Sequence, residues 1–157
     1  MSTRLEVAAT TEADLDRSWE VLVDWAGQSR WIPLTTVDVA QGDGRGVGSR
    51  LVALSGFWLG RVPVGLLDRF VVTGWSPPRE GEAELEVLHL GPYFTGEGVF
   101  HLHDLGDRTE VRATEVFTVP GGPPTNVPAR WLLPLMRVAF GSSLRQFAAV
   151  AEGRGRS

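Results

Sequence analysis

Two ionisable side chains, His89 and Glu115, fall among apolar residues in segments that alternate as β-strands do. Side chains point to opposite faces along a strand, so in 82–90 His89 shares a face with Val87. In 109–119 the same rule places Glu115 on the otherwise apolar face. A carboxyl and an imidazole in an apolar space can act as proton donors or acceptors. Both are therefore candidate catalytic residues, although solvation at a rim, or pairing with arginine or backbone, would explain them equally.

Two glycines separate these candidates in the expected sheet. Simple hairpin registers place Gly96 and Gly98 on the strand between those of His89 and Glu115. Neighbouring strands lie about 4.8 Å apart, so positions two strands apart are roughly 10 Å apart. Since glycines leave no side chain between them, we expect a hollow there. The polar group of a ligand, or a water, would sit in it and contact both candidates.

Three more polar residues could reach the same space. Parity along their strands points Asp68 and Ser55 inward. For Asp68, a structural ion pair with Arg69 or Arg61 is expected ahead of a ligand contact. Tyr93, the single tyrosine, begins a strand after a Gly-Pro turn. Its hydroxyl would contact either a ligand, as a third catalytic candidate, or solvent at the rim.

Other motifs predict neither a metal site nor a nucleophile. The sequence HLH at 101–103 puts two imidazoles on one side of a strand, but on the face assigned to solvent and with Glu97 as the only nearby third ligand. The glycine-rich stretch 41–48 lacks the Lys-Ser/Thr of a phosphate loop and predicts a mobile hairpin. There is no cysteine and no Gly-x-Ser-x-Gly elbow. No metal and no cofactor is expected.

Composition narrows the class of protein. The 157 residues fit one domain, expected over 1–152 with a disordered tail at 153–157. The 15 basic residues, all arginine, and 19 acidic ones give a net charge of −4 without a basic cluster, which argues against nucleic acid as a partner. No run of 18 apolar residues occurs, so no stable membrane insertion and a cytoplasmic location are expected. The oligomeric state stays open, a homodimer included.

Periodicity and turn residues indicate the elements that position these groups. A strand over 4–12 precedes a helix with an acidic first turn, which Gly27 is expected to end. The sequence QSRW then makes a second short helix, which Pro33 stops. Six further strands are expected at 35–41, 48–56, 67–75, 82–90, 93–104 and 109–119.

A long C-terminal helix should complete the fold. Asn126 is a candidate N-cap, and the apolar spacing continues to about Glu152. Met136 and Phe140 lie on its apolar face, and Pro134 should kink it or split off its first turn. The expected order of elements is an α+β arrangement with an antiparallel sheet and helices on one side.

Three tryptophans, Trp19, Trp25 and Trp31, are spaced six residues apart. Six residues are about 600° of helix, so the rings cannot share one face of a straight helix. We expect Trp19 to pack beneath the sheet, Trp25 to brace the bend and Trp31 to lean toward a cavity mouth. Trp31 and Trp58 are the tryptophans expected to touch a ligand.

Five motifs in this order resemble the START-like SRPBCC superfamily, with its helix-grip fold. They are DRSWEVLVDWAGQSRWIP (16–33), GVGSR (46–50), VVTGWSPPRE (71–80), GDRTEV (106–111) and SLRQFAAVAE (143–152). The most similar group is the polyketide cyclase/dehydrase and lipid-transport group. The resemblance implies a seven-stranded antiparallel sheet wrapped around the long C-terminal helix, two short helices after the first strand, and an internal cavity.

The resemblance also implies a partner, a hydrophobic small molecule such as a lipid, polyketide or aromatic metabolite. The expected function is carrier or sensor; the alternative is a cyclase/dehydrase-type enzyme that uses His89, Glu115 or Tyr93 for proton transfer. The fold does not decide between them. The expected ligand-binding residues are Trp31, Leu51, Ser55, Trp58, Asp68, Phe70, Val72, Val87, His89, Phe94, Gly96, Gly98, Phe100, Ala113, Glu115, Phe117, Met136 and Phe140.

Overall fold

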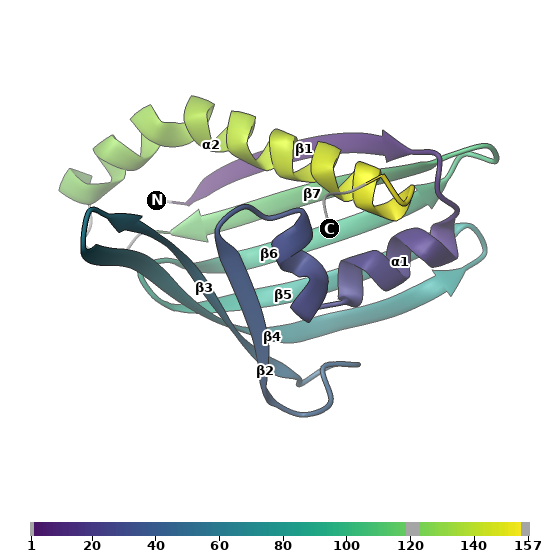
Figure 1. Ribbon diagram of the computed structural model, residues 1–157, viewed down its shortest axis with the longest axis horizontal. Helices are drawn as coiled ribbons and strands as arrows, with labels where there is room; N and C mark the ends of the chain where they lie inside the picture. Colours follow the sequence, from purple (N-terminus) through teal and green to yellow (C-terminus); the bar gives the residue numbers. More distant parts are fainter. Residues whose placement is uncertain (1, 119–122, 155–157) are drawn as a thin grey trace.

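One curved antiparallel sheet carries all the helices on the same side (Figure 1). The computed structural model describes residues 2–118 and 123–154, and of residues 57, 58 and 123–132 the backbone alone. The sheet has seven strands in the order β1-β7-β6-β5-β4-β3-β2. They are β1 (Thr3–Thr11), β2 (Thr35–Gln41), β3 (Arg50–Leu59), β4 (Val62–Arg79), β5 (Glu82–Pro92), β6 (Thr95–Asp104) and β7 (Thr109–Thr118). The predicted α+β arrangement with a seven-stranded antiparallel sheet is confirmed.

Two short helices follow β1, as predicted, but the first ends before Gly27. Helix α1 (Leu15–Val23) begins after Asp14, whose carboxylate accepts a hydrogen bond from the Arg17 backbone N–H at 2.7 Å. The 3₁₀-helix η1 (Ala26–Arg30) contains Gly27. Asp24, which caps α1, accepts the Gly27 N–H at 3.1 Å, so an aspartate rather than a glycine makes this turn.

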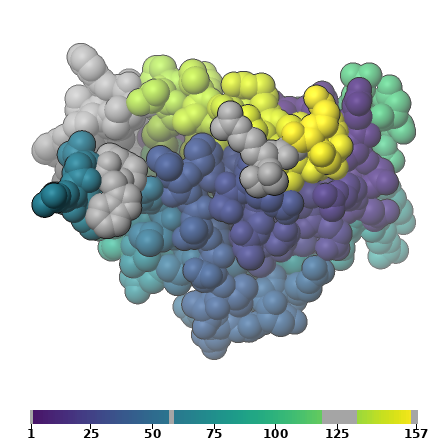
Figure 2. Space-filling view, in the orientation of Figure 1, coloured from purple at the N-terminus to yellow at the C-terminus, as the bar shows by residue number. Residues whose placement is uncertain are grey.

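Strand β3 begins and ends later than predicted, and β4 extends beyond both predicted bounds. Their hairpin closes at Gly60 and Arg61, and its tip projects at one end of the molecule (Figures 1 and 2). Strand β4 also continues through Pro77 and Pro78, which were expected to lie in a turn. The pairing with β5 shifts register between Ser76 and Arg79. A prolyl residue lacks the N–H that a regular ladder uses, and an irregularity of this kind accommodates it.

The long helix α2 (Pro123–Ala151) lies across the sheet and packs against β1, α1 and η1 (Figure 1). It begins three residues before Asn126, so the predicted N-cap is wrong. Proline fits the first turn of a helix, where no N–H is needed. The helix is continuous across Pro134, so the first turn is not split off. Among the described residues, none of the helices is long and apolar enough to cross a membrane.

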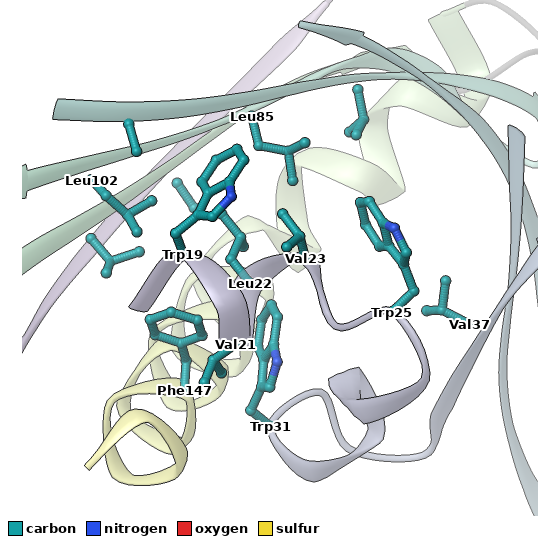
Figure 3. Packing of buried hydrophobic residues seen from close by; sticks show 14 of the residues in the cluster. Trp19, Val21, Leu22, Val23, Trp25, Trp31, Val37, Leu85, Leu102 and Phe147 are labelled. Atoms are coloured by element: carbon teal, nitrogen blue, oxygen red, sulfur yellow. The ribbon is translucent and has the colours of Figure 1, made fainter. Parts of the chain in front are cut away.

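The core lies between the sheet and α1, η1 and the second half of α2. Trp19 meets Trp75 of β4 edge-on, with ring centroids 5.1 Å apart, so its predicted position against the sheet is confirmed. Trp31 packs instead against Phe147 of α2, at 5.3 Å (Figure 3). Trp25 lies 5.9 Å from Phe70 of β4. The three tryptophans thus point to three different partners, because the chain turns between α1 and η1.

Candidate functional site

A largely buried histidine, His89, lies between two carboxylates on the concave face of the sheet. Its Nδ1 is 2.7 Å from Oδ2 of Asp68, and its Nε2 is 3.4 Å from Oε2 of Glu115. The side chains of His89, Asp68 and Glu115 are 12%, 14% and 11% exposed, respectively. We call Asp68, His89 and Glu115 the carboxylate–imidazole array. The first contact has the length of a strong hydrogen bond, whereas the second is a longer ion-pair contact without hydrogen-bond geometry.

Strand register and one irregularity bring the array together. Asp68 of β4 pairs with Pro92 of β5, while Phe70 pairs with His89. Two steps along β4, from Asp68 to Phe70, are thus matched by three steps along β5, from Pro92 to His89. This bulge sets Asp68 beside the imidazole. Glu115 lies on β7, with β6 between it and β5.

Strand β6 lets Glu115 reach across because it has no side chain at Gly98. Gly98 pairs with Val87 on one side and Glu115 on the other. A Cβ built on Gly98 would lie 2.7 Å from Oε1 of Glu115 and 3.0 Å from the Val87 methyl. The predicted inward position of Gly98 is therefore confirmed. The hollow is filled by the Glu115 carboxylate itself, which contacts His89 directly, so the expected gap for a ligand or water between them is absent.

Gly96 has a different reason to be glycine. It pairs with His89 and Phe117. A Cβ there would lie 2.0 Å from the Val116 carbonyl oxygen and 2.6 Å from Cα of Phe117. The close approach of the β7 backbone, not a hollow, therefore excludes a side chain at Gly96.

The predicted partner of Asp68 was wrong. Arg69 is the next residue along β4 and points to the opposite face, while Arg61 lies in the hairpin turn. Asp68 pairs with His89 instead. Strand alternation in the sequence placed both Asp68 and His89 on the inner face. It did not indicate the bulge that makes them neighbours. The second oxygen, Oδ1, is buried and has no hydrogen-bond partner within the part of the chain that the structure describes.

The two carboxylates keep His89 charged. Burial by itself lowers the pKa of an imidazole. The hydrogen bond to Asp68 and the negative charges of Asp68 and Glu115 outweigh burial and raise the pKa of His89 to about 9. The geometry agrees, since both ring nitrogens face a carboxylate oxygen and only the imidazolium has two N–H groups to offer. At neutral pH the array therefore contains an imidazolium between two carboxyl groups.

Aromatic rings surround the array. His89 lies 5.7 Å from Phe70 and 5.1 Å from Phe94, measured between ring centroids. Phe94 is in turn 6.4 Å from Phe117. Phe70 and Phe117 are buried, whereas Phe94 is half-buried. The array is thus a charged group on an otherwise apolar surface, with one ring that is not fully packed.

The other expected ligand-binding residues fall into three groups. Leu51, Val72, Val87 and Ala113 are buried on the concave face. Phe100, Met136 and Phe140 are half-buried. The Trp58 side chain lies outside the described residues. Their contact with a ligand stays a prediction.

Three further polar or aromatic candidates lie apart from the array. The hydroxyls of Ser55 and Thr35 hydrogen-bond each other at 2.7 Å across β3 and β2. Tyr93 is 51% exposed. Trp31 is 3% exposed between Phe100 and Phe147, and its indole N–H has no partner among the described residues.

On the convex face, the two histidines of HLH share one acid. Glu82 contacts Nε2 of His101 at 2.7 Å and Nδ1 of His103 at 2.5 Å. Glu97, expected as the third member, is not that acid. Across the described ranges, no three histidine or carboxylate side chains have the arrangement to hold a metal ion.

Comparison with known proteins identifies the fold. No family model matches the chain, and no curated protein has a similar sequence. Solved structures are similar over nearly the whole chain. The protein TTHA0849 of Thermus thermophilus has 15% identity and a TM-score of 0.73, over 96% of this chain and 98% of that one. The chain has the helix-grip fold.

Two other solved structures with this fold are similar over nearly the whole chain. The Zhui aromatase/cyclase from a Streptomyces species has 20% identity and a TM-score of 0.69, over 98% of this chain and 96% of that one. Ara h 8.0201 has 11% identity and a TM-score of 0.69, over 98% and 99%. The resemblance to the SRPBCC superfamily is confirmed at the level of the fold. One fold can serve several functions, so these similarities show the fold alone.

Proposed function

We propose that this chain binds a hydrophobic small molecule on the concave side of its sheet, as a carrier or sensor. The carboxylate–imidazole array carries the proposal, because it is a polar group of defined geometry on an apolar surface. Ligand sites commonly combine such a surface with a few convergent polar groups. The apolar body of the ligand would lie against Phe94 and its polar end would meet Asp68.

Half-buried apolar side chains support the proposal. Phe94, beside His89, is half-buried. On α2, Met136 and Phe140 are half-buried, whereas Leu144 and Phe147, further along the helix, are buried. A close-packed interior normally buries side chains of this size. A half-buried aromatic ring beside a charged group, as Phe94 is beside His89, is what an apolar ligand would cover.

Native mass spectrometry of the chain purified from its own host is the direct test. A stoichiometric hydrophobic molecule, released by denaturation and identified, is the expected result. Titration with the neutral fluorescent probe N-phenylnaphthylamine complements it, with Phe94→Ala expected to weaken probe binding. Leu54→Ala is the matched control, because Leu54 is an exposed apolar residue on the other face of the sheet. Binding unaffected by Phe94→Ala would contradict the proposed place of the ligand.

A second candidate function, proton transfer in a cyclase/dehydrase reaction, is favoured by the charged His89 alone. The carboxylate of Glu115 or Asp68 would take a proton from the carbon beside a ketone. The His89 imidazolium would protonate the hydroxyl on the next carbon, which leaves as water while the carbon–carbon double bond forms. The fold similarity to the Zhui aromatase/cyclase is consistent with this chemistry.

A simple substrate separates the two functions. The β-hydroxy ketone made from acetone and benzaldehyde loses water to give benzylideneacetone, which absorbs in the near ultraviolet. An enzyme would accelerate this step, and His89→Gln would abolish turnover while probe binding persists. A carrier would bind the probe and leave the rate of dehydration unchanged.

A further inference from the structure

The array contains more acid than base. Asp68 and Glu115 share the single imidazole of His89, and no arginine pairs with either carboxylate in the described ranges. The strands around the array contribute apolar neighbours to the concave face, among them Leu51, Phe70 and Val87. One imidazolium is a full counterion for only one carboxylate, and a carboxylate without a partner in apolar surroundings is unfavourable.

One oxygen of the array, Oδ1 of Asp68, accepts no hydrogen bond from the described residues. Asp68 Oδ2 already accepts from His89 Nδ1 at 2.7 Å, whereas Oδ1 is buried and unpaired within the described residues. A buried acceptor in a native structure ordinarily has a donor, from protein, water or ligand. The faces of nearby aromatic rings, Phe70 and Phe94 beside His89, also attract positive charge.

We propose that the ligand of this site carries a protonated amine, which donates to Asp68 Oδ1 and neutralises the array. This rests on the proposed function and narrows it from hydrophobic molecules in general to apolar, and especially aromatic, amines. A ligand carboxylate would meet two carboxylates and be rejected. A neutral hydroxyl could donate to the same oxygen but would leave the negative charge uncompensated.

Three probes with the same ring system test this: naphthylethylamine, naphthylethanol and naphthylacetate, titrated calorimetrically against the full chain at neutral pH. The amine is expected to bind about tenfold or more tightly than the alcohol, since hydrogen bonds between charged groups are the stronger ones. The acetate is expected to bind weakest. Asp68→Asn should reduce amine affinity about tenfold and change alcohol affinity less than about twofold.

The matched control is Asp38→Asn, the same change of charge on an exposed residue of β2; it should leave all three affinities unchanged. If the alcohol binds as well as the amine, or the acetate binds best, the amine proposal is overturned and the proposed function stands. If none of the three binds, the proposed function itself fails. The probe series on the unmodified chain decides the matter even if Asp68→Asn does not fold.

Discussion

The carboxylate of Glu115 lies directly over Gly98, where a Cβ would come within 2.7 Å of Oε1. The absent side chain on β6 is the reason why an acid on β7 reaches an imidazole on β5. Since the neighbour is the end of a flexible side chain, a methyl group at this position would displace the carboxylate rather than the backbone. The contact between Glu115 and His89 therefore depends on a glycine that touches neither a ligand nor a proton.

Gly98→Ala should lower the pKa of His89 from about 9. The added methyl moves the Glu115 carboxylate away, which removes one of the two negative groups that stabilise the imidazolium. An NMR titration of the His89 ring measures the shift directly. Gly141→Ala on α2 is the control, because a Cβ there meets only Arg145 Nη1, at 3.6 Å. An unchanged pKa in Gly98→Ala would mean that Asp68 alone holds the proton on His89.

Stability should fall as pH rises through the pKa of His89. The folded chain raises this pKa from 6.5 to about 9, so it holds the proton more tightly than the unfolded chain. The stabilisation is therefore complete below pH 6.5 and is lost as the pH rises through about 9. At about 1.4 kcal/mol for each pKa unit, the loss is about 3 kcal/mol.

Urea unfolding of the unmodified chain and of His89→Gln across this pH window measures the effect. The unmodified chain should lose free energy of unfolding relative to the variant as the pH rises. His101→Gln, on the convex face and 41% exposed, should follow the unmodified chain. A pH-independent difference between the chain and His89→Gln would contradict the raised pKa.

Much of this site could be predicted from strand alternation. The inward position of Val87, His89, Gly98 and Glu115 depends only on the period of two along each strand. Short turns fixed the registers of β5, β6 and β7 relative to one another, because short hairpin loops leave few alternatives. The face of the sheet on which each side chain lies could therefore be predicted without knowing its neighbours.

The contacts of His89 with Asp68 and Glu115 could not be predicted from the sequence. Asp68 meets His89 because of a bulge between β4 and β5, and a bulge changes register without changing the alternation on either side. The bridging of β6 by Glu115 depends on a side-chain conformation, which the strand pattern does not contain. The same limit hid the true length of β4, whose prolines are typical of turns but lie where the pairing shifts.

Thr11→Val should destabilise the junction between β1 and the end of α2. The Thr11 hydroxyl is buried, lies 3.1 Å from the Ala148 carbonyl and accepts the Ala13 N–H at 3.2 Å. Valine has the same shape without the hydroxyl. The Ala13 N–H therefore loses its partner and the Ala148 carbonyl keeps only the Glu152 N–H, at a cost of about 1 kcal/mol. Thr10→Val, exposed on the same strand, is the matched control. Equal urea midpoints for the two variants would contradict this role of the hydroxyl.

Trp25→Phe should loosen the loop between β2 and β3 and, through it, the array. The indole N–H of Trp25 donates to the Gly44 carbonyl at 2.7 Å, and its ring lies 5.9 Å from Phe70, which itself touches His89. Phenylalanine keeps a ring but loses the buried hydrogen bond, which should lower the free energy of unfolding by about 1–3 kcal/mol.

Hydrogen exchange of the loop amides, together with urea unfolding, measures both consequences of Trp25→Phe. Exchange at residues 42–48 should accelerate, because Trp25 anchors the loop to the segment between α1 and η1. Val47→Ala, in the same loop and 68% exposed at position 47, should leave stability unchanged. If Trp25→Phe weakens stability while loop exchange stays unchanged, its contribution is packing against Phe70 and not the bond to Gly44.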